Sequence, residues 1–66
     1  MKLEPDHARA YVNRGLARKA LGDLKGAIAD LKKGDKLLLE QGVISHHQSI
    51  QAEIEKLRGA IAEQQR

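Results

Sequence analysis

Residues 11–31, which read YVNRGLARKALGDLKGAIADL, decide the fold of this chain. Two segments with helical periodicity meet in this stretch at a Gly22-Asp23 turn. Gly15 lies inside the first segment, where a glycine costs about 0.5–1 kcal/mol relative to alanine. Ala27 is the matching small residue early in the second segment. Because helices approach closely where their facing side chains are small, the stretch predicts a tight helical hairpin.

Turn and capping residues predict where the two helices of the hairpin begin and end. Gly22 suits the left-handed position that ends a first helix over residues 7–21. Asp23 can cap the free amides of a second helix over residues 24–41, and Gly42 can end it in the same way. The predicted element order is therefore helix, short turn, helix.

A third amphipathic segment follows the hairpin. Its aliphatic residues recur at spacings of four, three and four, which is the period of a helix face: Ile50, Ile54, Leu57 and Ile61. Ser45 and Gln48 match a capping box, so we expect the helix to be capped by Ser45. The spacing suits a capping helix that folds back on the hairpin and equally a short coiled-coil strand that pairs with another chain.

The composition limits how large a core the chain can build. Its 66 residues include no cysteine, phenylalanine or tryptophan and one tyrosine, so Leu, Ile, Val and Ala must supply the core. A chain of this size without disulfides is marginal by itself. We therefore expect either self-association or neighbouring repeats of a larger array.

Six residues of the first 31 carry a family resemblance: Tyr11, Gly15, Gly22, Asp23, Ala27 and Leu31. At these positions the chain resembles a tetratricopeptide repeat, which has a period of about 34 residues. It departs from the family pattern at Arg14, Arg18 and Leu39, where the pattern has leucine, an aromatic residue and proline. Bacterial repeats with similar NRG and AIAD segments also look like this chain.

The resemblance implies an all-α fold, with a tetratricopeptide-type helical hairpin followed by a third, C-terminal helix. Such a fold would be a fragment of a right-handed superhelix. Residues 1–42 would form one repeat with the tail of a preceding one, and residues 43–66 a capping or coiled-coil helix. The expected function is that of a protein–protein interaction module.

The family resemblance also points to a binding face on the first helix, because first helices line the concave surface of such stacks. Two basic residues flank two aliphatic residues there, with an amide beside them: Arg9, Val12, Asn13, Leu16 and Lys19. This face suits a peptide with acidic groups, held by charge at its ends and by apolar contact between them. The alternative function is a structural homo-oligomerisation module that pairs through the four aliphatic residues of the third segment.

Arg14 is the most informative departure from the family pattern. A bulky cation beside Gly15 needs a partner if it approaches an apolar interface. Asp30, three residues after Ala27, is the best candidate, and an Arg14–Asp30 pair would fix the register of the hairpin.

Other function classes find little support in the sequence. Adjacent histidines on a helix point about 100° apart, so His46 and His47 do not close on one metal ion, and we expect no metal or cofactor. No nucleophile, base and orienting acid stand together, so we expect no enzyme.

The remaining expectations concern charge and location. Asp30 and Asp35 interleave Lys32, Lys33 and Lys36, so we expect a solvated convex face and no nucleic-acid binding. The longest apolar runs are too short for a membrane span, and the absence of cysteine fits a cytoplasmic protein.

Overall fold

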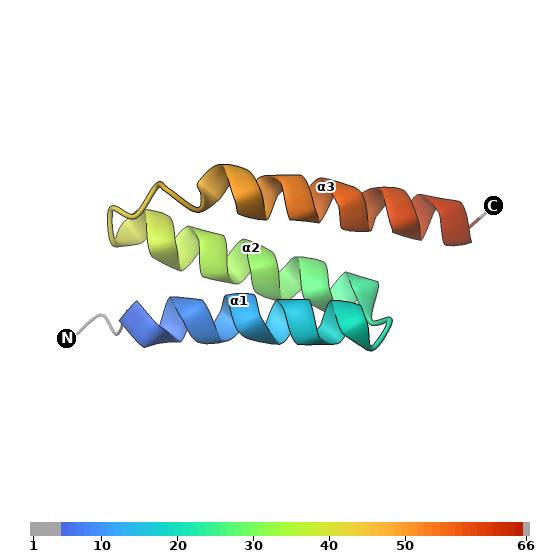
Figure 1. Cartoon of the computed structure of the whole chain (residues 1–66), viewed down its shortest axis with the longest axis horizontal. Helices are drawn as coiled ribbons and strands as arrows, with labels where there is room; N and C mark the ends of the chain where they lie inside the picture. The colour runs from blue at the N-terminus through green and yellow to red at the C-terminus, as the bar shows by residue number, and fades with distance from the viewer. Residues whose placement is uncertain (1–4, 66) are drawn as a thin grey trace.

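The computed structural model describes residues 5–65, and the side chains of residues 7–65. It consists of three α-helices: α1 (Pro5–Ala20), α2 (Leu24–Glu40) and α3 (His47–Gln64). The helices run in alternating directions, with α2 packed against both α1 and α3 (Figure 1). The prediction of an all-α fold, with a helical hairpin followed by a third helix, is confirmed.

Residues 1–4 and 66 lie outside the described part of the chain. The predicted tail of a preceding repeat falls largely on residues 1–4. The observed helices otherwise match the predicted ranges to within two residues at each end of the hairpin helices.

The turn between α1 and α2 follows the predicted capping chemistry. Gly22 has φ +88°, a left-handed conformation that favours glycine. The Asp23 amide donates to the Arg18 carbonyl at 2.8 Å, which closes α1 as a Schellman turn does. The Asp23 side chain accepts from the Gly26 amide at 3.0 Å and so caps α2. The hairpin turn is therefore encoded locally.

The connection from α2 to α3 begins as predicted and then differs. Gly42 has φ +80°, and the Val43 amide donates to the Leu38 carbonyl at 2.8 Å. The predicted capping box at Ser45 is wrong, because the N-cap of α3 is His46 and it makes no side-chain capping bond. The first amide of α3, that of His47, instead donates a backbone hydrogen bond to the Ile44 carbonyl at 3.2 Å.

Two pairs of small residues let α1 and α2 approach at backbone distance. A Cβ added to Gly15 would lie 3.1 Å from the Ala27 carbonyl oxygen and 3.0 Å from Leu31 Cγ. A Cβ added to Gly34 would lie 3.1 Å from the Ala8 carbonyl oxygen. Within each helix the two small residues are seven positions apart, about two turns, so both contacts fall on one face. The sequence predicted the first contact and missed the second.

The core lies on both sides of α2. Its buried apolar residues come from all three helices: Ala8, Ala27, Leu31, Leu38, Ile50, Ile54 and Leu57. Since three of these belong to α3, this helix folds back onto α2 of the same chain. The choice that the sequence left open is decided in favour of the folded-back arrangement.

The glycine contacts make a testable prediction about stability. Gly34→Ala should lower the free energy of unfolding by about 1–3 kcal/mol, since the new methyl group meets the Ala8 carbonyl and Val12. Gly15→Ala should also lower it. Gly59, in α3, is the control, because a Cβ there meets no atom within 4 Å.

We expect Gly59→Ala to raise the free energy of unfolding by about 0.5–1 kcal/mol through helix propensity. Urea unfolding followed by circular dichroism measures all three variants. A stabilising effect of Gly34→Ala equal to that of Gly59→Ala would contradict the close approach of α1 and α2.

Candidate partner-binding groove

A groove of about 780 Å³ runs between α1 and α3 above α2. Leu31 and Leu38 of α2 form its floor, and Val43 lines it where α2 ends. Because α1 and α3 both pack on α2 rather than closely on each other, the groove stays open to solvent. This arrangement leaves an apolar trough with polar edges.

Four of the five residues predicted to bind a partner line the α1 wall of this groove: Arg9, Val12, Asn13 and Leu16. Val12 is half-buried, while Leu16 is 43% exposed, which is high for a leucine beside a core. No ion pair involves Arg9 among the residues whose side chains are described. The α1 wall thus offers apolar surface beside a cation that has no carboxylate partner among the side chains of residues 7–65.

Lys19, the fifth predicted residue, does not line the groove. Its ammonium group forms an ion pair with Glu53 of α3, one turn beyond Leu16. This ion pair links α1 to α3 beside the groove, which Glu53 also lines. The charge of Lys19 is consequently engaged within the chain.

Most of the residues predicted to form an oligomer interface lie in the hydrophobic core of this chain. Ile50, Ile54 and Leu57 are buried against α2, and Ile61 is half-buried. Ile50 also lines the groove, together with Ser49. Pairing of two copies through these residues would therefore require α3 to leave α2.

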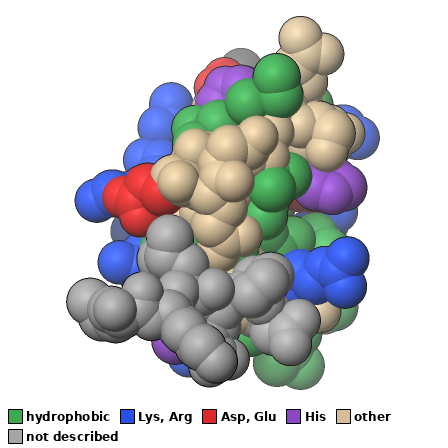
Figure 2. All heavy atoms as spheres, turned by 90° about the vertical axis from the view of Figure 1, so that its left-hand side faces the viewer, with side chains coloured by type: hydrophobic (Ala, Val, Ile, Leu, Met, Phe, Trp, Pro, Cys, Tyr) green, Lys and Arg blue, Asp and Glu red, His purple; other side chains and the backbone are tan. Residues whose placement is uncertain are grey.

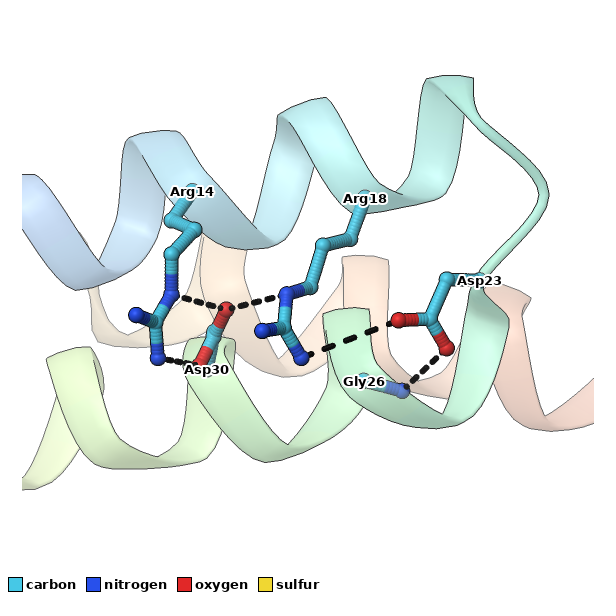
Figure 3. A network of polar contacts seen from close by, with 5 residues as sticks. All are labelled: Arg14, Arg18, Asp23, Gly26 and Asp30. Carbon is cyan, nitrogen blue, oxygen red and sulfur yellow. Dashed lines mark hydrogen bonds and ion pairs between the residues drawn. The ribbon is translucent and has the colours of Figure 1, made fainter.

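Arg14 and Asp30 join α1 to α2 through the contacts drawn in Figure 3, and neither residue lines the groove. Arg14 donates from Nε and Nη2 to the two carboxylate oxygens of Asp30, each at 2.9 Å. Arg18 lies 3.3 Å from the same carboxylate and 3.6 Å from that of Asp23. The predicted Arg14–Asp30 pair is confirmed, and Arg18 extends it into a network that reaches the hairpin turn.

This network shifts the protonation of its members. The hydrogen bonds from Arg14 lower the pKa of the buried Asp30 carboxyl below its usual 3.8, against the opposing effect of burial. The positive charges of Arg14 and Arg18 lower it further. The same hydrogen bonds raise the pKa of Arg14.

A second polar cluster joins α2 to α3 and was missed by the sequence analysis. His47 Nδ1 lies 2.9 Å from one oxygen of the buried Asp35 carboxylate, and Gln51 Nε2 donates to that oxygen at 3.1 Å. Asp35 stands four residues after Leu31 and three before Leu38, within the apolar stripe of α2. A carboxylate within the apolar stripe of α2 needs a polar partner, so the position of Asp35 was the signal that could have predicted a polar contact with α3.

Part of the chain is similar to known proteins. The chain is 54% identical over 33 residues to a protein named "FK506-binding protein-like" from Mus musculus, and equally to one of that name from Rattus norvegicus. Each alignment covers 50% of this chain and 10% of the relative, so the chain spans about a tenth of the length of these relatives. No family model and no solved structure matches the chain.

Within residues 5–65, no helix is both long enough and apolar enough to cross a lipid bilayer.

The Arg14–Asp30 pair predicts a difference between two arginines of α1. Arg14→Ala should lower the melting temperature more than Arg9→Ala, because it leaves the buried Asp30 carboxylate without its two-bond partner. Arg9 forms no ion pair among the described side chains and serves as the matched control. Thermal unfolding measures both, and equal shifts would contradict a structural role for the pair.

The lowered pKa of Asp30 predicts acid lability. The stabilisation is fully present above the unfolded pKa, near 3.8, and is lost as the pH falls through the lower folded value. Urea midpoints measured downward from about pH 5 should therefore fall more steeply for the parent protein than for Asp30→Asn, which has no carboxyl to titrate there. Identical pH profiles would count against this assignment.

Proposed function

We propose that the chain is a protein–protein interaction module of tetratricopeptide-repeat type, and that the groove between α1 and α3 binds a peptide segment of a partner protein. The observation that carries this proposal is the convergence of Arg9, Val12, Asn13 and Leu16 on one wall of an open apolar groove. Binding grooves of this kind bury apolar anchors and orient them with a few polar groups.

The lining of the groove indicates the chemistry of the segment it would bind. Leu31, Leu38 and Leu16 offer an apolar surface for an aliphatic or aromatic anchor. Arg9 at the rim would pair with a carboxylate of the same segment, since it has no such partner in the described part of the chain. A segment with an apolar anchor next to an acidic group fits both features.

Peptide binding in the groove would involve no reaction and no cofactor, and neighbouring repeats or a second copy could pack alongside. Because three of the four α3 residues predicted for self-association are buried in the chain's own core, peptide binding takes precedence over oligomerisation through α3. We expect the module to act in the cytoplasm, in keeping with a sequence that has no cysteine.

Selection of peptides from a displayed library tests this function. A selected peptide should shift the NMR methyl signals of Val12 and Leu16, which lie on the groove wall. Arg9→Glu should weaken its binding by about tenfold or more through charge reversal, measured by calorimetry. Lys56→Glu, an exposed position on α3 that does not line the groove, should leave the affinity nearly unchanged.

Two results would refute peptide binding in the groove. One is the absence of any selected peptide that moves the Val12 and Leu16 signals. The other is an equal loss of affinity in Arg9→Glu and Lys56→Glu, which would show that only overall charge matters.

A further inference from the structure

The solvent-facing side of α2 carries a row of lysines. Lys25, Lys32 and Lys36 are exposed and spaced by seven and four residues, which places them within about 40° of one another around the helix and along about 16 Å of its axis. Lys33, also exposed, lies beside them. We call these four residues the lysine stripe.

The two acids that interleave the lysine stripe in the sequence do not neutralise it in space. Asp30 is 4% exposed and is held by Arg14 and Arg18 of α1. Asp35 is 5% exposed and contacts His47 of α3. Interleaving in the sequence therefore does not neutralise the lysines, because each carboxylate turns into a different helix interface.

The net positive charge of the molecule is concentrated on the exposed surface of α2. The four lysines of the stripe and Glu40, the one exposed acid of α2, sum to 4 − 1 = +3. The formal net charge of the whole chain is also +3, so all its other Lys, Arg, Asp and Glu residues balance. Among the described side chains, no ion pair involves a lysine of the stripe.

The lysine stripe faces away from the groove. Leu31 of the groove floor points about 100–140° around α2 from Lys32, Lys25 and Lys36. A ligand on the stripe would accordingly leave the groove accessible. This surface is distinct from the one that carries the proposed function and does not depend on it.

We propose that the lysine stripe is a second docking surface, which binds an acidic segment of a partner protein. A linear row of point charges on one helix complements carboxylates spaced along a linear chain. Lysines on an exposed helix face also keep their charge accessible while their stems lie along the helix.

Nucleic acid fits this surface less well. Aromatic stacking and arginine forks are the usual companions of phosphate contacts. Tyr11, the one tyrosine, lies on α1 under the Arg14 guanidinium at 5.4 Å and stacks with His7. Arg14 and Arg18 are bound to Asp30. Anionic lipid also attracts clusters of basic residues on a helix, and phosphatidylserine vesicles therefore serve as a competing ligand in the experiment.

Fluorescence anisotropy with a fluorescein-labelled poly-glutamate peptide tests the proposal. At low salt the parent chain should bind the peptide, and Lys32→Glu/Lys36→Glu should weaken binding by about tenfold or more. Lys56→Glu/Arg58→Glu on α3 changes the net charge equally and should weaken it by less than about threefold. Circular dichroism confirms folding, and Lys32→Gln/Lys36→Gln replaces the first variant if that one unfolds.

Each other outcome would overturn the proposal. Equal weakening by the two double variants would indicate a response to overall charge alone. Loss of binding in Arg9→Glu with retention in Lys32→Glu/Lys36→Glu would place the peptide in the groove. Tighter binding of a single-stranded oligonucleotide or of phosphatidylserine vesicles, or no binding of the peptide at low salt, would reject an acidic protein segment as the occupant.

Discussion

The structure depends on the backbone contact between α1 and α2. Gly15 meets the backbone of Ala27, and Gly34 meets the backbone of Ala8, so each contact pairs a glycine with an alanine. A glycine inside a helix is locally unfavourable, so each glycine costs stability that close packing of the hairpin must offset. The close approach brings Asp30 within reach of Arg14 and leaves Leu31 beneath the groove.

The central helix α2 has three different sides, which face α1, α3 and solvent. One side meets α1 through the small residues and Asp30, and another meets α3 through apolar residues and Asp35. Its remaining side carries the lysine stripe into solvent (Figures 1 and 2 show the bundle from the side and from one end). Among the described side chains, no buried nitrogen or oxygen lacks a hydrogen-bond partner. The two buried acids thus join helices rather than interrupting the core.

The end of the bundle at which α2 passes into α3 exposes hydrophobic side chains beside histidine and basic ones (Figure 2). Ile44, in this connection, is 74% exposed. The apolar surface of the chain is therefore not confined to the core and the groove. A larger assembly, such as a stack of repeats, would have apolar surface to cover at this end.

Local chemistry explains why much of the fold could be predicted. Gly22 and Gly42 have the left-handed conformations expected of helix ends, and Asp23 caps α2, because these effects act within a few residues. The capping box at Ser45 was predicted wrongly because α3 begins one residue later, with His46 as its N-cap, and the His47 amide donates to the Ile44 carbonyl. The start of a helix depends on which of two neighbouring residues becomes its N-cap, here Ser45 or His46.

The sequence alone determined three helices, the turn between the first two, the small-residue contact at Gly15 and the four residues on the α1 wall of the groove. Only the tertiary structure decided that α3 folds back, that Lys19 pairs with Glu53, and that Asp30 and Asp35 turn away from the lysine stripe. The physical reason is that periodicity assigns a residue to a helix face, whereas its charge partner is chosen by the helix packed against that face.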